Sequence, residues 1–309
     1  MDNSPESRQD RKFPLVYAVI LNTNKRDDTL ECLRSLVENN YPNLRVIVLD
    51  NASTDGSVEA IRAGFPQVEI IQLTENLGYA GNNNVGIQAA LDRHADWVFI
   101  LNEDTILSPE CVSVLVACGE TNPKVGALGP LVYHADEPDV IQSAGGYLDA
   151  HWRPLHTGIN ETDRGQYAEV REVEWISGCG LLVRREALQQ AGLIDPRFFY
   201  YNEETELCQR IKRMGWSLWM VPSAKLWHKG VQRNYHPSAN ATYYKVRNFL
   251  LFLDLIHAPA RIKALTWMEN LRMVASYTLR RKWRHARDHR DAAVQGMRDY
   301  LMKRWGKRG

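Results

Sequence analysis

The chain lacks the features that mark several common classes of protein. Its five cysteines are scattered, their number is odd and no Cys-x-x-Cys pair occurs. A structural zinc site or a disulfide framework is therefore not expected, and a reducing compartment fits better. Residues 1–12 are polar and contain no apolar core of a secretory signal. The longest apolar run, Phe249–Ile256, is interrupted by Asp254 and is far shorter than the roughly 20 residues of a spanning helix. We expect a cytoplasmic protein, attached at most to the inner face of a membrane.

Two common nucleotide-binding signatures are also missing. The Gly- and Asn-rich stretch Gly78–Asn84 lacks the Lys-Ser/Thr pair of a P-loop and does not match Gly-x-Gly-x-x-Gly. Its glycines would still let the backbone approach a ligand, and the helix that it opens would favour phosphate at its N-terminus. Taken alone, the stretch leaves two interpretations open: a phosphate-binding turn, or an ordinary loop capped by asparagines.

Charge is unevenly distributed, although the formal net charge is only +1. Residues 261–309 contain 14 Lys+Arg and 4 Asp+Glu, whereas residues 1–260 carry an excess of acidic residues. Basic helices with interleaved aromatic residues, here Trp267, Trp283 and Trp305, can lie on an anionic membrane surface. The alternative is a helical bundle with a solvated basic face. No recognised nucleic-acid-binding motif accompanies the charge, so no nucleic acid partner is expected.

Hydrophobic patterning predicts an α/β fold. Short apolar runs that are rich in Val, Ile and Leu alternate with helical patterns, which predicts a mainly parallel sheet buried on both faces and built with right-handed crossovers. We expect a disordered leader at 1–12, the α/β domain at 13–240 and a basic helical region at 241–309. The first four predicted strands are Val16–Leu21, Val46–Leu49, Ile70–Leu73 and Trp97–Leu101.

The rest of the chain is less regular. Gly126–Val132 and Val173–Val183 are predicted as strands, and Glu204–Met214 as a helix that Gly215 ends. Asp27 and Asp28 are the candidate caps of the first helix. Three further helices are predicted over Tyr243–Leu255, Ala260–Leu279 and Lys282–Trp305.

Polar residues follow each of the first four predicted strands, at Asn22–Asn24, Asp50–Ser53, Glu75–Gly78 and Asn102–Asp104. Any one of these could be a helix N-cap. Because ligands bind beyond the carboxyl ends of such strands, four polar endings on one edge favour a binding cleft. A carboxylate at the tip of a buried strand, such as Asp104, suits a hard cation such as Mg²⁺ or Mn²⁺.

Three carboxylates lie together at a predicted helix start: Glu203, Glu204 and Glu206. Acidic residues there complement the helix dipole, but three are more than a helix start needs. The aromatic residues at 198–201 would lower the local dielectric and raise a carboxylate pKa towards the range of a general base. His228, by itself, is more simply explained as a structural histidine than as a ligand.

Together these segments resemble the family 2 glycosyltransferases of the GT-A fold, in particular the rhamnosyltransferase-like branch that builds bacterial surface polysaccharides. The match runs from about Val16 to Asn248, and its pieces fall in the family's order. The pieces are VLDNASTDGS (48–57), ENLGYAGNNNVGI (75–87), VFILNEDT (98–105), SGCGLLVRREAL (177–188), GLIDPRFFYYNEETELCQR (192–210), WHKG (227–230) and YYKVRN (243–248).

The resemblance implies a role for each candidate residue. Thr23 and Asp50 would bind the base, with Asp50 accepting from the imide N–H of uracil or thymine. Asp104 would be the metal ligand of the Asp-x-Asp motif and His228 a later metal or diphosphate ligand, with Mg²⁺ or Mn²⁺ as the cofactor. Glu204 falls where the family has its catalytic Asp. The remaining residues are assigned to the nucleotide sugar (Asn76, Asn82, Asn83 and Asn102) and to the acceptor side (Gly178, Cys179 and Glu203).

Two residues depart from the family's pattern. Asn102 stands where many relatives have Asp, an exchange familiar in this branch. Glu204 is one methylene longer than the usual Asp, which leaves Glu206 as a competing candidate for the base.

The implied reaction is a single in-line displacement with inversion. A sugar, rhamnose as the first choice, would move from a dTDP- or UDP-sugar to a glycan or lipid-linked acceptor, whose hydroxyl proton Glu204 would take. One alternative is a sugar-phosphate nucleotidyltransferase, but Asn22–Arg26 leads into an acidic helix start instead of that class's Gly-rich basic loop. The other is a non-catalytic nucleotide-sugar-binding module, which would not need carboxylates at Asp104 and Glu204.

Overall fold

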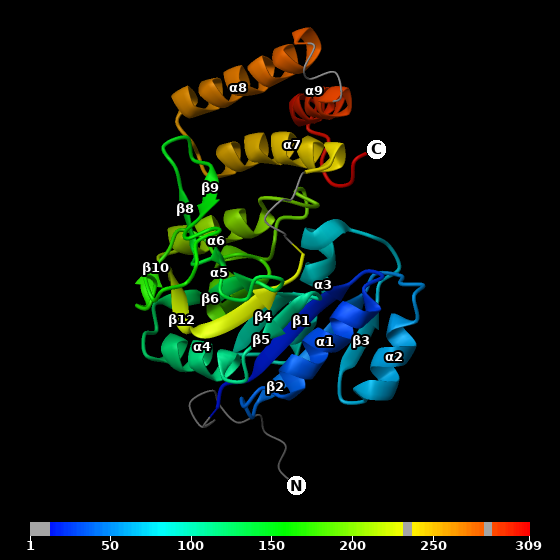
Figure 1. Ribbon diagram of the computed structural model, residues 1–309, viewed down its shortest axis with the longest axis vertical. Helices are drawn as coiled ribbons and strands as arrows, with labels where there is room; N and C mark the ends of the chain where they lie inside the picture. Colours follow the sequence, from blue (N-terminus) through cyan, green and yellow to red (C-terminus); the bar gives the residue numbers. More distant parts are fainter. Residues whose placement is uncertain (1–12, 231–236, 281–285) are drawn as a thin grey trace.

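The computed structural model describes residues 13–230, 237–280 and 286–309, so the predicted leader at 1–12 lies outside the described residues. A mixed sheet flanked by helices forms the body of the molecule, and three helices lie along one end of it (Figure 1). The strands are β1 (Val16–Asn22), β2 (Leu44–Asp50), β3 (Glu69–Gln72), β4 (Trp97–Asn102), β5 (Thr105–Leu107), β6 (Val125–His134), β7 (Ile141–Ser143), β8 (Gly146–Leu148), β9 (Pro154–His156), β10 (Arg171–Glu172), β11 (Gly180–Arg184) and β12 (Ser217–His228). The helices are α1 (Arg26–Val37), α2 (Ser57–Gly64), α3 (Gly78–Asp92), α4 (Cys111–Glu120), α5 (Arg185–Ala191), α6 (Glu203–Arg213), α7 (Ala239–Leu255), α8 (Ala260–Leu279) and α9 (Arg287–Leu301).

The main sheet has the order β10-β12-β6-β11-β4-β1-β2-β3, with β5 paired to β12 and β7 to β6. Strand β1 runs parallel to β2 and β4, and β2 runs parallel to β3, as the alternating pattern predicts. Strand β11 is antiparallel to both β4 and β6, which makes the sheet mixed. The predicted mixed, mainly parallel α/β architecture with C-terminal helices is confirmed.

Alternate residues of the central strands feed two separate hydrophobic cores. Val19 of β1 and Ile100 of β4 pack on one face against α3, α5 and α6. Ile20 and Leu101 pack on the other face against α1, α2 and α4. The period-2 alternation of a strand explains this division, and burial on both faces explains the continuous apolar runs.

Two local predictions were wrong. The segment Val173–Val183 is not one strand, because Gly180 N donates to Ser177 O (3.1 Å) in a tight turn, and β11 begins only at Gly180. Asp27 and Asp28 do not cap α1; they lie within its first turn, where they complement the helix dipole. An outside residue satisfies the helix start instead, since Arg26 N donates to Asp55 Oδ2 (2.9 Å).

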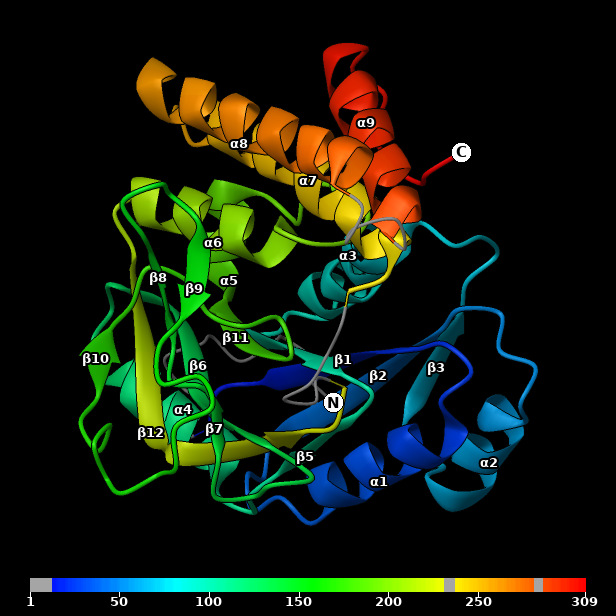
Figure 2. The same ribbon diagram turned by 45° about the horizontal axis from the view of Figure 1, so that its top comes forward.

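The C-terminal helices form a layer on the loops that lead into α6 (Figure 2). Helix α7 starts earlier than predicted, because Ser238 Oγ caps it by accepting from Ala241 N (3.1 Å). Its apolar face covers Phe198, and α9 packs on its other side. Helix α9 is shorter than the predicted Lys282–Trp305, and residues 282–285 lie outside the described part. Within the described residues, no helix is long and apolar enough to cross a membrane.

Candidate active site

A cavity of about 440 Å³ opens at the carboxyl ends of the parallel strands. The strand register sets Asn22 beside Asp50 and Leu21 beside Asn102, so the polar endings of β1, β2 and β4 meet at one edge. Ten of the predicted site residues line this cavity: Thr23, Asn76, Asn82, Asn102, Asp104, Gly178, Cys179, Glu203, Glu204 and His228. Residues as far apart in the chain as Thr23 and His228 therefore line one cavity.

The other two predicted residues lie outside the cavity lining. Asp50 is buried, and its carboxylate accepts from Asn22 Nδ2 (2.9 Å) and Ser53 N (3.2 Å). Asn83 is buried within α3, where its amide donates to a backbone carbonyl one turn earlier. Asn51, the neighbour of Asp50, does line the cavity, and its Nδ2 donates to Thr23 Oγ1 (3.3 Å).

The sheet brings Asp104 and His228 together. Strand β12 ends at His228, which pairs with Thr105 of β5, so that His228 Nε2 lies 3.1 Å from Asp104 Oδ1. Gln142 Oε1 accepts from His228 Nδ1 (2.8 Å) and thereby directs Nε2 into the cavity, where Asn102 Nδ2 lies 3.2 Å away. Burial opposes ionisation of Asp104, but the contact with His228 outweighs it and holds the pKa of the Asp104 carboxyl below its usual value.

Helix α6 presents Glu203 and Glu204 to the cavity at its first turn. Within the described part of the chain, one carboxylate oxygen of each is buried without a hydrogen-bond partner. Burial raises the pKa of Glu204, and burial together with the nearby Glu204 charge raises the pKa of Glu203. The sequence-based expectation of a raised carboxylate pKa at this helix start is confirmed in direction. Glu204 therefore has the environment of a general base.

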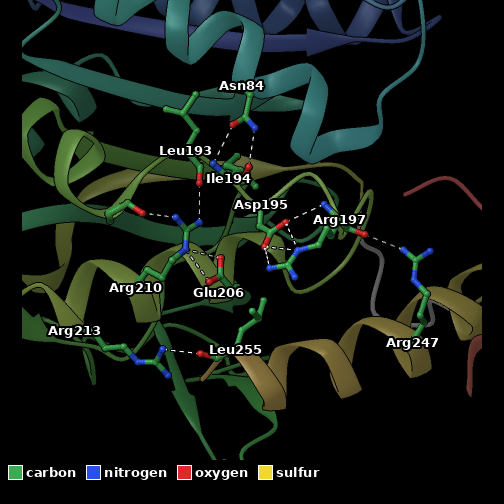
Figure 3. A network of polar contacts seen from close by, with 11 residues as sticks. Asn84, Leu193, Ile194, Asp195, Arg197, Glu206, Arg210, Arg213, Arg247 and Leu255 are labelled. Atoms are coloured by element: carbon green, nitrogen blue, oxygen red, sulfur yellow. Dashed lines mark hydrogen bonds and ion pairs between the residues drawn. The ribbon is translucent and has the colours of Figure 1, made fainter. Parts of the chain in front are cut away.

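Glu206 has a different role in the same helix (Figure 3). Arg210 Nε donates to both of its carboxylate oxygens (2.7 and 2.8 Å), and Arg210 Nη2 donates to Leu193 O (2.7 Å). Asn84 of α3 holds the next residue, Ile194, through both its N–H and its C=O. This network fixes α6 against the preceding loop and α3, and Glu206 does not line the main cavity.

A second contact joins α3 to the loop before α6. Gly78 has φ +75°, and a Cβ there would lie 2.4 Å from Phe199 O, so only glycine fits. The next residue, Tyr79, donates from its N–H to Phe199 O (2.7 Å) and from its hydroxyl to Gly178 O (2.8 Å). Tyr79 thus ties the Gly- and Asn-rich turn to two other walls of the cavity.

Helix α7 holds the aromatic loop in place. Asn248 Nδ2 donates to the carbonyls of Phe198 (2.7 Å), Tyr200 (2.7 Å) and Tyr201 (3.1 Å). The fully buried Arg247 adds a further donor to Phe198 O (3.1 Å). Because Tyr201 has φ +73°, a left-handed conformation that costs a non-glycine residue free energy, this loop needs such external support.

Four residues that line the cavity or hold its lining in place were not assigned a role from the sequence: Asn51, Tyr79, Glu103 and Asn248. Glu103 lines the cavity, and burial, followed by the charge of Asp104, raises its pKa to about 7. Each of these residues belongs to a motif segment already identified from the sequence. Which side chain of a segment faces the cavity depends on the direction of the backbone there, and a sequence motif does not specify that direction.

The family model described as "Glycosyl transferase family 2" matches residues 17–192. The N-acetylglucosaminyl-diphospho-decaprenol L-rhamnosyltransferase of Mycobacterium tuberculosis is 31% identical over 229 residues, covering 68% of this chain and 74% of the relative. The dTDP-rhamnosyl transferase RfbF of Shigella flexneri is 26% identical over 260 residues, covering 79% of this chain and 81% of the relative. The chain belongs to glycosyl transferase family 2 and is a glycosyltransferase.

Solved structures show the same fold. GalNAc-T7, solved with UDP, GalNAc and Mn²⁺, superposes with a TM-score of 0.61 at 16% identity; the match covers 79% of this chain and 49% of that chain. The mannosyltransferase PcManGT from Pyrobaculum calidifontis, in complex with GDP-Man and Mn²⁺, gives a TM-score of 0.55 at 17% identity, covering 94% of this chain and 88% of that chain. Both neighbours are glycosyltransferases, which confirms the predicted GT-A fold.

Proposed function

We propose that this chain is an inverting, metal-dependent glycosyltransferase that moves rhamnose from a dTDP- or UDP-sugar to a lipid-linked glycan in bacterial surface polysaccharide synthesis. One observation carries the proposal: Asp104, His228 and Glu204 line the same cavity as Thr23, Asn76 and Asn82. The residues proposed to hold the diphosphate and the residue proposed as the base thus line one cavity. Rhamnose is the first choice because two relatives are named for rhamnosyl transfer, one of them with a dTDP-sugar.

Glu204 would act as the general base. Its partly buried carboxylate has a raised pKa and an oxygen that is free to accept, within the described residues, the proton of an acceptor hydroxyl. The hydroxyl oxygen attacks the anomeric carbon, the bond to the nucleotide diphosphate breaks on the opposite side, and the configuration inverts. A well-placed base contributes about 10²–10⁴-fold to such a step. Glu206 is a weaker candidate because Arg210 occupies its carboxylate.

Asp104 and His228 would hold a divalent cation, Mg²⁺ or Mn²⁺. Their facing atoms are a carboxylate oxygen and an imidazole nitrogen, 3.1 Å apart, and both atom types bind such ions. The described residues contain no group of three His, Cys, Asp or Glu side chains that could hold an ion, so diphosphate oxygens would complete the coordination. Once bound, the cation would neutralise charge on the departing diphosphate. Asn102 Nδ2 lies 3.2 Å from the same Nε2, so its amide would turn away from Nε2 when that nitrogen binds the ion.

The nucleotide sugar would extend from the β1–β2 edge towards α6. Thr23 and Asn51 line the cavity where the nucleobase would lie. Asp50 would accept a hydrogen bond from the nucleobase only after its side chain rotates. Asn76 and Asn82 line the wall next to the diphosphate and sugar. Gly178, Cys179 and Glu203 would approach the sugar from the acceptor side.

We further propose that α8 rests on an anionic membrane surface at the inner face. Ala264, Met268, Leu271, Ala275 and Leu279 recur at helical spacing along its exposed side, and Leu279 is 79% exposed. The surrounding region is strongly basic, which matches the combination that draws a helix onto anionic lipid. Flotation with phosphatidylglycerol vesicles should recover the protein, and the double variant L271E/L279E should lose most of the binding. Equal flotation of that variant would exclude α8 as the contact.

A nucleotide-sugar panel tests the proposed function. Calorimetry with dTDP-rhamnose, UDP-sugars and GDP-mannose, each with and without Mn²⁺, should show one preferred donor and metal-enhanced affinity. Asp104→Asn should lower the donor affinity measured with Mn²⁺ by at least 10-fold, while the donor affinity measured without metal should stay similar. NMR of the product should show the anomeric configuration opposite to that of the donor. Retention of configuration would rule out the single displacement proposed here.

A further inference from the structure

A second cavity of about 570 Å³ reaches Glu204 from the side of the C-terminal helices. It lies between α7, α8 and the hairpin of β8 and β9, whose closeness is visible in both ribbon views (Figures 1 and 2). Tyr201 and Glu204 belong to the linings of both cavities, whereas Asp104 and His228 belong only to the first. The residue proposed as the base therefore stands where the two cavities meet.

The lining of this second cavity suits a sugar with an attached apolar group. Trp175, Phe249 and Met273 give it aromatic and aliphatic surfaces, and flat aromatic faces are suited to packing on a sugar ring. His156 packs edge-on against Trp175 (4.6 Å between ring centroids), and burial lowers the pKa of His156 to about 4, so it is a neutral hydrogen-bonding group. Asn270 adds an amide at the α8 side.

One cation in this lining has no ionic partner among the described residues. Lys245 of α7 places its Nζ 4.9 Å from the centroid of the Tyr201 ring, the ring shared by both cavities. Two other lysines of the chain are paired, Lys229 with Asp28 (2.8 Å) and Lys263 with Asp254 (2.6 Å). An ammonium that lines a cavity without a carboxylate of its own is suited to an anionic ligand such as a phosphate group.

Helix α8 separates this cavity from the surface that we assign to the membrane. Thr266, Glu269 and Asn270 of α8 line the cavity, whereas Met268 and Leu271 lie on its exposed side. An acceptor whose phosphate and sugar enter the cavity could therefore keep its apolar chain beside the same helix. The two faces of α8 thus fit the two parts of one amphipathic ligand.

We propose that this second cavity is the acceptor site, and that Lys245 binds the phosphate of a glycosyl acceptor joined to a lipid through phosphate. The inference rests on the proposed function, because it takes Glu204 as the base between donor and acceptor. The acceptor hydroxyl loses its proton to Glu204 and its oxygen forms the new bond to the anomeric carbon, while the nucleotide diphosphate departs into the first cavity. Lys245 takes no part in these bond changes and sets only where the acceptor lies.

Farnesyl diphosphate is a direct probe, because it carries the lipid and phosphate without a sugar. Titration is carried out on the full chain with saturating dTDP and Mn²⁺, so that the first cavity is filled. We expect the wild-type protein to bind the probe and Lys245→Met to weaken binding at least 10-fold. Asn270→Trp, which fills part of the cavity with an indole ring, should weaken binding of the probe to a similar extent. Farnesol, which lacks the phosphate, should bind the wild-type protein and Lys245→Met with equal affinity.

Lys225→Met is the matched control. Lys225 also lies over a tyrosine ring, that of Tyr133 (5.7 Å), but on β12 and outside the cavity, so its removal should change probe affinity less than twofold. An unchanged affinity in Lys245→Met, or no binding by the wild-type protein, would overturn the acceptor assignment. Failure of the donor panel with intact farnesyl diphosphate binding would instead refute the proposed function alone.

Discussion

Removal of one amide group, in Asn248→Ala, tests how the C-terminal helices support the active site. Asn248 Nδ2 donates to the carbonyls of Phe198, Tyr200 and Tyr201, all in the loop that carries aromatic residues into the cavity. Of these three acceptors, Phe198 O keeps the donor from Arg247. The variant therefore weakens the hold on two carbonyls directly and on the third only in part.

The expected magnitude follows from these contacts. A buried hydrogen bond contributes about 1 kcal/mol net, so the loss amounts to about 2–3 kcal/mol in the free energy that keeps the loop closed. This loss should raise the fraction of molecules with an open loop about 30- to 150-fold. Because proteolysis of an open state follows its population when opening and closing are fast, the cleavage rate should rise by the same factor. The loop also positions Tyr201 beside Glu204, so kcat should fall at least 10-fold.

Limited trypsin digestion measures the opening, because Arg197 immediately precedes the buried Phe198. We expect mass spectrometry to show cleavage after Arg197 at a rate raised by the factor above. Asn43→Ala is the control: Asn43 Nδ2 also donates to a carbonyl (Phe13 O, 2.9 Å), but at the far edge of the sheet. A cleavage rate and kcat in Asn248→Ala equal to those of the control would refute the anchoring role.

Further predictions concern the buried carboxylates and the tight approach at Gly78. Because burial raises the pKa of Glu204, kcat/KM should rise with pH along a limb above the ordinary 4.5 of glutamate, and this limb should persist in Glu103→Gln. Because the pKa of Glu203 is higher in the folded than in the unfolded state, this group lowers the free energy of unfolding as pH rises from about 4.5 through its folded pKa. Urea unfolding at pH 5 and pH 8 should show this loss of stability in the wild-type protein, and Glu203→Gln should remove it. Gly78→Ala should weaken donor binding at least 10-fold. Gly56→Ala has a similar φ of +79° but no atom within 4 Å of the added Cβ, so it should lower folding stability through backbone strain and leave donor affinity unchanged. Equal donor affinities in the two glycine variants would contradict the contact with Phe199.

The sheet and its functional edge could be predicted from the sequence because they depend on local patterns. Buried strands are continuous apolar runs, and the polar residues that follow them meet at one edge whatever the exact register. Asp104 could be named because it stands at the end of a predicted strand, whereas only the resemblance to the family singled out Glu204 from Glu203 and Glu206. The structure then brings both to one cavity.

The remaining parts of the site depend on long-range contacts that no local pattern encodes. The loop before α6 holds non-glycine residues such as Tyr201 at positive φ, and its anchor Asn248 lies 47 positions further along the chain. The second cavity forms only where α7 and α8 meet the β8–β9 hairpin. Asp50 has a side chain suited to contact a ligand, but Asn22 Nδ2 and Ser53 N donate hydrogen bonds to its carboxylate.

The central claim, that Glu204 deprotonates the acceptor beside a separately built donor site, is tested most directly by Glu204→Gln. With the donor that the panel identifies, the variant should keep donor affinity within about threefold by calorimetry, while single-turnover transfer slows by at least ~10²-fold. Glu203→Gln, one residue away in the same first turn of α6, should retain transfer within about 10-fold, because it does not supply the base. A Glu204→Gln enzyme that transfers sugar at nearly the wild-type rate would contradict the account.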